Sequence, residues 1–290
     1  MRGGAPPAGP RRLRVADWLA AAERMPCLDL RGAAEFARGH LPGAGNLPLA
    51  ELAGRKQELP PPGTPLFLVG GELAAAGLAR LGASGRWPLA WSEEPPASWP
   101  ATALVRDPPS PLWGPNPWLA AQAARLRPAG RVLDLGMGSG RNAVWLAGRG
   151  FALSGIDRLP EAVASAEALA RRHGVPLAAR VGDARDPGAL APGGWDGILL
   201  IDYFERSLLP RLPAALAPGG LLIVETFLRA QTAPGGRPRR ARWLLEPGEL
   251  AASCAGALEI LALAEGEAAP GRQVASLLAR RPQNRAGESA

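Results

Sequence analysis

The sequence has few cysteines and almost no lysine. Only Cys27 and Cys254 occur among its 290 residues, and Lys56 is the single lysine. Two cysteines exclude a disulfide-stapled scaffold and a cysteine-rich zinc domain, and no other metal site is predicted. We expect both cysteines to be buried thiols in a reducing compartment, which favours a cytoplasmic protein.

Long apolar runs are also absent. No stretch of about 18 uncharged apolar residues occurs, so no transmembrane helix and no membrane partner are predicted. Residues 1–14 are rich in Gly, Pro and Arg but lack the apolar centre of a secretory signal. A hydrophobic fraction of 47% with 20% charged residues favours packed cores. The length is typical of two domains.

The net charge of +7 is unevenly distributed. Residues 101–290 carry 22 basic and 17 acidic side chains, and five arginines in one acid-free stretch account for this surplus: Arg229, Arg237, Arg239, Arg240 and Arg242. One interpretation is a solvated loop in an arginine-rich chain. The other is a basic patch that attracts an anionic substrate or nucleic acid.

A segment rich in proline and tryptophan separates two regular parts of the chain. We predict a first domain over residues 11–100, a linker over 101–117 and a second domain over 118–282. Disordered linkers are poor in large aromatic residues, so the tryptophans in and beside this linker predict that it is ordered and packed.

The second part alternates between apolar strand patterns and helical patterns, and it ends in two strands joined by a short loop. This order predicts an α/β, Rossmann-like sheet of seven strands, closed by an antiparallel pair. The predicted strands are 131–135, 151–156, 177–181, 197–201, 221–225, 258–264 and 273–279, and the predicted helices are 118–126, 142–149 and 160–173.

A glycine-rich turn follows the first strand of this domain. Gly136, Gly138 and Gly140 stand in the order G-x-G-x-G and lead into a helix, where a ligand approaches the main chain closely. Arg141 occupies the place where a dinucleotide fingerprint needs a small residue, and no P-loop motif occurs. The turn therefore favours a nucleotide-like cofactor other than a dinucleotide.

Acidic residues follow the next two strands. Asp157 stands where a carboxylate accepts both hydroxyls of a ribose, and Asp183 is in reach of an adenine amino group. A single acid at a strand end is more often a helix cap, but an ordered series at successive strand ends is a stronger signal.

The runs VLDLGMGSGRN, SGIDRLPEAV, VGDARD, WDGILLIDYF and LAPGGLLIVETF resemble class I S-adenosylmethionine-dependent methyltransferases, most closely the tellurite-resistance-type and related small-molecule enzymes. This resemblance implies S-adenosylmethionine as cofactor, with the glycine turn under its methionine part. The implied cofactor-binding residues are Asp134, Gly136, Gly138, Gly140, Asn142, Asp157, Arg158, Asp183, Ala184 and Asp202.

Tyr203 and Glu225 follow the fourth and fifth strands, where a general base would lie, and they are the candidate catalytic residues. The residues 201–204 read Ile-Asp-Tyr-Phe instead of the [N/D]-P-P-[Y/F/W] motif of the similar DNA and RNA amino-methyltransferases. This difference makes methylation of base amino groups less expected without excluding other RNA targets, and the resemblance to small-molecule enzymes favours a small-molecule acceptor. The alternatives are a methyltransferase acting on RNA, through the Arg229–Arg242 stretch, or on protein, and a scaffold that binds cofactor without catalysis.

The first domain resembles rhodanese-like domains. Leu28-Asp29-Leu30-Arg31 and the run GHLPGAGNLPL carry the resemblance. Active members of that family place a nucleophilic cysteine after the strand that 65–69 occupies here, but this chain continues with Gly70-Gly71-Glu72. The sequence therefore predicts an accessory domain without sulfur-transfer activity. The sequence does not indicate an oligomeric state.

Overall fold

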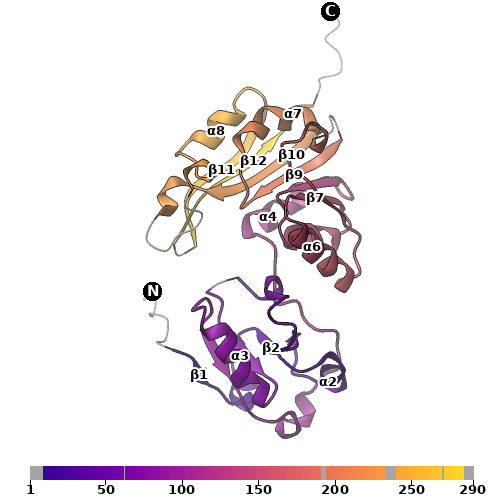
Figure 1. Ribbon diagram of the computed structural model, residues 1–290, viewed down its shortest axis with the longest axis vertical. Helices are drawn as coiled ribbons and strands as arrows, with labels where there is room; N and C mark the ends of the chain where they lie inside the picture. The colour runs from indigo at the N-terminus through magenta and orange to yellow at the C-terminus, as the bar shows by residue number, and fades with distance from the viewer. Residues whose placement is uncertain (1–8, 62, 191–193, 233–239, 270, 284–290) are drawn as a thin grey trace, which may run out of the picture. The chain divides into compact units, whose positions relative to one another are not determined.

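A computed structural model describes residues 9–61, 63–190, 194–232, 240–269 and 271–283 (Figure 1). The chain divides into two compact units, Met1–Gly114 and Pro115–Ala290. Among the described residues, no helix is long and apolar enough to cross a membrane.

The first unit is built on a five-stranded sheet whose strand pairs are all parallel, in the order β1-β5-β4-β2-β3. Its central strand is buried along its whole length, which explains its continuous apolar run. The elements are β1 (Arg11–Arg12), α1 (Val15–Ala20), β2 (Cys27–Asp29), α2 (Ala33–Arg38), β3 (Gly45–Asn46), η1 (Lys56–Glu58), β4 (Leu66–Val69), α3 (Glu72–Gly82), β5 (Leu89–Trp91), η2 (Pro96–Ser98) and η3 (Ala101–Ala103).

Most of the predicted linker belongs to this first unit. Val105 forms a two-way backbone bridge with His40, and the side chain of Leu112 lies so close to Gly45 that a Cβ there would collide with it. Trp99, just before the segment, is buried. The apolar side chains of the segment fill gaps in the first core, so residues 101–114 are not a separate linker.

The second unit contains a seven-stranded sheet in the order β11-β12-β10-β9-β6-β7-β8. The strands are β6 (Arg131–Leu135), β7 (Ala152–Asp157), β8 (Ala178–Val181), β9 (Trp195–Ile201), β10 (Leu216–Phe227), β11 (Glu259–Ala269) and β12 (Arg272–Arg280). The helices are α4 (Pro117–Gln122), η4 (Ala123–Arg125), α5 (Arg141–Ala147), α6 (Pro160–Arg172), η5 (Pro187–Ala189), η6 (Arg206–Arg211), α7 (Leu212–Ala215), η7 (Arg229–Thr232), η8 (Ala241–Trp243) and α8 (Glu249–Cys254).

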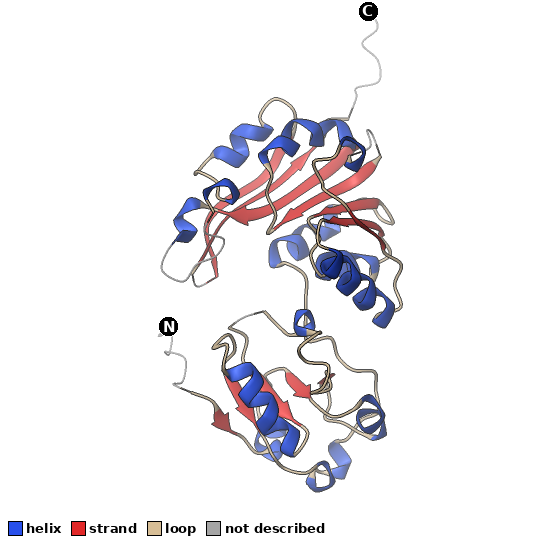
Figure 2. Cartoon of the chain, viewed as in Figure 1, coloured by secondary structure: helices blue, strands red, loops and turns tan. Residues whose placement is uncertain are grey.

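Strands β6 to β10 run parallel, and β12 inserts antiparallel between β10 and β11. Helices lie on both sides of the sheet (Figure 2). Leu119 of α4 and Leu146 of α5 belong to one buried cluster, whereas Leu212 of α7 and Leu250 of α8 belong to another. The parallel order brings the carboxyl ends of five strands to one edge, as the sequence pattern predicts.

Element ends differ from the predictions by a few residues, and β10 differs most. It begins at Leu216 instead of residue 221, because Leu216 pairs with Trp195 ahead of an irregularity that contains Pro218, Gly219 and Gly220. Proline and glycines conceal this early part of the strand in the sequence.

Candidate active site

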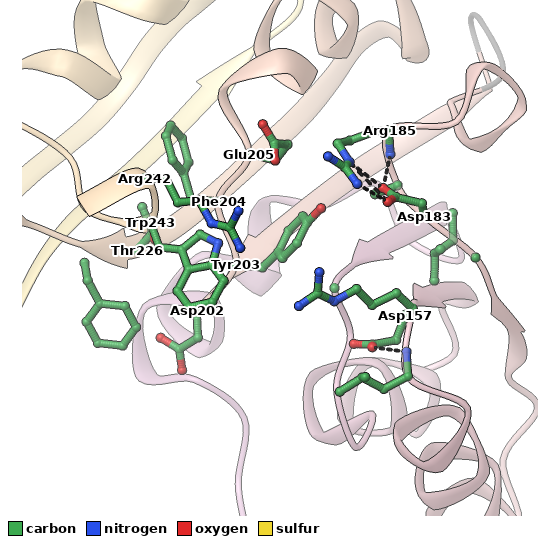
Figure 3. A pocket seen from close by; sticks show the side chains of 17 residues that line it. Asp157, Asp183, Arg185, Asp202, Tyr203, Phe204, Glu205, Thr226, Arg242 and Trp243 are labelled. Carbon is green, nitrogen blue, oxygen red and sulfur yellow. Dashed lines mark hydrogen bonds and ion pairs between the residues drawn. The ribbon is translucent and has the colours of Figure 1, made fainter. Parts of the chain in front are cut away.

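A cavity of about 420 Å³ opens at the carboxyl ends of the parallel strands (Figure 3). One end is formed by residues at or just after the carboxyl ends of β6, β7 and β8, and the other by residues at or just after the carboxyl ends of β9 and β10 together with η8. Its lining is Gly136, Ile156, Asp157, Arg158, Leu159, Gly182, Asp183, Ala184, Arg185, Asp202, Tyr203, Phe204, Glu205, Thr226, Phe227, Arg242 and Trp243.

The glycine turn after β6 adopts left-handed backbone geometry at all three glycines, Gly136 (φ 68°), Gly138 (φ 55°) and Gly140 (φ 77°). A Cβ at Gly136 would collide with the ring of Tyr203, whereas a Cβ at Gly138 would meet open space. The first glycine therefore lets the tyrosine ring pack on the main chain, and the second leaves room above the turn.

Asp157 ends β7 and links the glycine turn to α6. Gly138 donates its backbone N–H to Oδ2 and Leu159 donates its own to Oδ1, each at 2.9 Å. A carboxylate oxygen has two lone pairs, and each oxygen of Asp157 accepts one of these hydrogen bonds, so each keeps one lone pair available. Because Asp157 lines the cavity, these lone pairs suit a pair of neighbouring hydroxyl groups.

Asp134 lies beneath the turn in β6 and does not line the cavity. Its side chain is 1% exposed, and its Oδ2 has no hydrogen-bond partner among the described residues. Burial, with a smaller effect of Asp157, raises the pKa of Asp134 to about 7. A protonated acid at this position avoids a second negative charge beside Asp157.

We expect Asp134→Asn to remove a pH dependence of stability. The folded state of the parent binds this proton more tightly than the unfolded state does, so its stability falls as pH rises from about 4 to about 7. This fall in the free energy of unfolding is on the order of 4 kcal/mol, at about 1.4 kcal/mol for each pKa unit. Urea unfolding of parent and variant at pH 4.5 and pH 8 measures this contribution. The other titrating groups are the same in both proteins, so their effects cancel when the two free energies of unfolding are subtracted. An equal gap in stability at both pH values would contradict the expectation.

Asp183 follows β8 and also lines the cavity, but Arg185 already occupies its carboxylate. The backbone N–H and Nε of Arg185 donate to Oδ1 at 2.9 and 3.0 Å, and Nη2 donates to Oδ2 at 2.6 Å. These hydrogen bonds from Arg185 lower the pKa of Asp183 to about 2. The neighbouring amide N–H of Ala184 has no hydrogen-bond partner among the described residues, so it is the better-placed free polar group at this position.

Tyr203 lies at the middle of the cavity, with its ring against Gly136. Burial, followed by the charges of Asp183 and Glu205, raises the pKa of Tyr203 to about 12. The hydroxyl therefore keeps its proton at neutral pH, and the side chain serves as a hydrogen-bond donor more readily than as a base.

Glu225 is buried outside the cavity lining and binds three donors. Asn116 Nδ2, Arg272 Nη2 and Ser276 Oγ approach its carboxylate at 2.6, 2.8 and 3.0 Å. Arg272 also binds Asp202, which has a left-handed backbone (φ 56°). The predicted base is thus the centre of a network that connects α4, β10 and β12.

Asn142 belongs to the same region through its side-chain oxygen, which accepts the backbone N–H of Asn116 at 2.9 Å. The predicted cofactor set therefore separates into two groups. Gly136, Asp157, Arg158, Asp183, Ala184 and Asp202 line the cavity, whereas Asp134, Gly138, Gly140 and Asn142 are absent from its lining.

Sequence reasoning missed two kinds of residue at this site. Asn116 and Arg272 come from distant segments, and only the antiparallel pairing of β12 with β10 brings Arg272 near Glu225. Arg242 and Trp243 enter the cavity from η8, although Arg242 was visible as the last arginine of the acid-free stretch. Nothing in their local pattern marks them as cavity residues.

A model of the methyltransferase domain family matches residues 132–220. This match covers the glycine turn, Asp157 and Asp183. The second unit contains a class I methyltransferase domain. The matched residues supply the whole β6–β8 end of the cavity.

Curated relatives of the methyltransferase domain align with this chain over only part of their own length. The ubiquinone biosynthesis O-methyltransferase of Xanthomonas axonopodis pv. citri is 33% identical over 43% of this chain and 56% of that protein. The ribosomal protein L11 methyltransferase of Thermus thermophilus is 37% identical over 38% of this chain and 44% of that protein. The chain thus spans about half the length of these relatives.

Among solved structures, the Burkholderia thailandensis 1,6-didemethyltoxoflavin-N1-methyltransferase with bound 1,6-didemethyltoxoflavin and S-adenosylhomocysteine aligns with a TM-score of 0.46. It is 21% identical, and the alignment covers 58% of this chain and 78% of that one.

The residues that line this cavity fit S-adenosylmethionine. Asp157 keeps two lone pairs for a ribose diol, and the space above Gly138 is open. Ile156 and Leu159 supply apolar surface beside Asp157 for a flat base. The carboxylate of Asp183 fits less well, because Arg185 holds it.

Proposed function

We propose that this protein transfers a methyl group from S-adenosylmethionine to a small-molecule acceptor. The single observation that carries the proposal is that Asp157, beside an open glycine turn, shares one cavity with a separate set of residues after β9 and β10. One end of the cavity then holds the cofactor and the other holds the acceptor.

When bound, S-adenosylmethionine supplies a sulfonium methyl group that is already activated for displacement. The chain's own part is to bind, align and exclude water. Asp157 binds the ribose hydroxyls, and the Ala184 amide donates to the adenine ring. Tyr203 separates the two ends of the cavity and offers a protonated hydroxyl as donor. Glu225 takes no part in proton transfer, because it lies outside the cavity lining and three donors bind its carboxylate.

The contacts of the arginines in the Arg229–Arg242 stretch favour a small-molecule acceptor over an RNA acceptor. Arg229 pairs with Glu246, and the guanidinium groups of Arg240 and Arg242 lie over the ring of Trp243. Arg237 and Arg239 lie outside the described residues. The described arginines of this stretch thus serve local contacts and the cavity, not one continuous basic face.

Calorimetry with S-adenosylmethionine, followed by a transfer assay with a labelled methyl group, tests the proposal. We expect binding to the full chain, and transfer to members of a small-molecule panel but not to total RNA or protein. Absence of cofactor binding would refute the proposal. Binding without transfer to any acceptor class would favour a scaffold, and transfer to RNA or protein would favour the corresponding alternative.

We also infer that the first unit is a rhodanese-like accessory domain without sulfur-transfer activity. Gly70 and Gly71 after β4 have positive φ angles and lead at once into α3 at Glu72, so no cysteine-bearing loop stands there. Cys27 is 1% exposed, and burial, with the charge of Asp29, raises the pKa of its thiol well above the usual range. Such a thiol is a poor nucleophile.

With thiosulfate and cyanide as substrates, we expect no thiocyanate from the full chain above the buffer rate, since no thiolate is accessible. Colorimetric detection of thiocyanate measures this. Turnover that disappears in Cys27→Ser would contradict the inference, and Cys254→Ser serves as the matched control because Cys254 is also buried but belongs to the second unit.

A further inference from the structure

The aromatic side chains of the cavity all lie at one end. Four of the 17 lining residues are aromatic, although aromatic residues make up 5% of the chain. Tyr203 and Phe204 follow β9, Phe227 ends β10 and Trp243 ends η8, whereas the lining residues at the β6–β8 end include no aromatic side chain. The acceptor end therefore offers a surface that suits a flat ring.

A cation without an acidic partner stands beside these rings. The guanidinium carbon of Arg242 lies 4.9 Å from the centroid of Trp243, and the side chain is exposed to the cavity. No ion pair joins Arg242 to an acid among the described residues. By contrast, Arg185 across the cavity is already bound to Asp183. Figure 3 shows Arg242 and Trp243 directed into the same space as Tyr203.

The acids at this end are already engaged. Asp202 forms an ion pair with Arg272. Glu205 accepts hydrogen bonds from the backbone N–H and the hydroxyl of Ser207. Asp202 and Glu205 thus have partners other than Arg242, and no acid binds the Arg242 guanidinium among the described side chains, so its N–H groups are available to an anion.

The backbone that carries Arg242 is held in place by Arg206. Nη1 of Arg206 donates to the carbonyl oxygen of Arg242 and Nη2 to that of Leu244, both at 2.8 Å. Glu249 binds the same guanidinium at 2.5 and 2.9 Å, which orients it. Because the backbone at Arg242 and just after it is held, and the guanidinium lies over Trp243, Arg242 presents its planar fork at a defined position, as recognition of a carboxylate requires.

We propose that the methyl acceptor is a flat aromatic anion. Its ring packs against Tyr203 and Phe227, and its carboxylate or equivalent oxyanion binds the N–H fork of Arg242 over Trp243. This inference rests on the proposed methyl transfer and names the chemical class of its acceptor. A guanidinium stacked on an indole keeps its N–H edge available, so the same residue packs on Trp243 and binds the acid.

Three ligands test the aromatic ring and the negative charge of the acceptor separately. They are 3,4-dihydroxybenzoate, its neutral methyl ester, and cyclohexanecarboxylate, an anion without an aromatic ring. Calorimetry of each ligand is performed on the full chain saturated with S-adenosylhomocysteine. We expect the aromatic acid to bind at least tenfold more tightly than either of the other two, because only it matches both the rings and the cation.

The variants are Arg242→Gln and, as matched control, Arg240→Gln. Arg240 lies over the same indole at 5.3 Å but does not line the cavity. We expect Arg242→Gln to weaken binding of the aromatic acid about tenfold to a hundredfold and to leave the ester within about twofold. Arg240→Gln should leave both ligands within about twofold.

Equal binding of acid and ester to the parent, failure of the acid to bind, or equal losses in the two variants would each overturn the inference. Cofactor binding is measured first and separately. A chain that binds S-adenosylmethionine and methylates only neutral or non-aromatic acceptors refutes the acceptor class alone, whereas a chain that binds no cofactor refutes the proposed function.

Discussion

Replacement of Asp157 by alanine is expected to weaken binding of S-adenosylmethionine by a hundredfold or more. The carboxylate keeps one lone pair on each oxygen for the ribose hydroxyls. Two charge-assisted hydrogen bonds contribute about 1.5 to 3 kcal/mol each, and about 1.4 kcal/mol corresponds to a factor of ten in the dissociation constant. The variant also loses the tether to Gly138 that shapes the turn. Calorimetry on parent and variant measures the loss.

Two further variants make this test specific. Asp157→Asn retains an oxygen for the backbone amides but lacks the charge, so we expect a smaller loss than for alanine. Glu167→Ala removes an acid from the outer face of α6, where it pairs with Arg171 at 3.9 Å, and should leave affinity unchanged. Unaltered affinity in Asp157→Ala, with native melting behaviour, would show that the ribose site lies elsewhere.

Glu225→Ala is expected to destabilise the second unit by about 3 to 5 kcal/mol. Glu225 is 4% exposed, and its carboxylate accepts hydrogen bonds from Asn116, Arg272 and Ser276. Its removal leaves the partly buried positive charge of Arg272 with one acidic partner fewer. Asp202 stays bound to Arg272 and limits the loss. Urea unfolding followed by circular dichroism measures the difference in free energy.

Glu259→Ala is the matched control for this variant. Glu259 also pairs with an arginine of β12, Arg280, but both side chains are about half exposed. We expect a change below about 1 kcal/mol. If Glu225→Ala were as mild as Glu259→Ala and instead abolished methyl transfer in a folded protein, Glu225 would act as a base and its structural role would be refuted.

The sheet and its ligand-binding edge could be predicted from the sequence because they rest on local patterns. The apolar run at 131–135, the glycines after it and the acids after the next two strands all lie within about 50 residues. Strand and helix periodicities mark the elements, and parallel order places the strand ends at one edge. The cavity includes Gly136, Asp157 and Asp183 at that edge.

The charge state and partners of the same acids could not be predicted in this way. Asp134, Asp157 and Asp183 look equivalent in the sequence, yet one is buried, one keeps lone pairs for a ligand and one is bound by Arg185. These differences arise because burial and neighbouring donors depend on the packed structure. Residue type and position alone do not contain that information.

The sequence by itself determined the α/β order, the glycine turn, the acids at the strand ends and the missing cysteine after β4. Each depends on residues close together in the chain, whose conformational preferences act locally. Tertiary structure alone decided that Glu225 binds Asn116, 109 residues away, and that Arg242 enters the cavity while Arg240 does not. Such contacts form between distant segments, and only the assembled core sets their distances and charges.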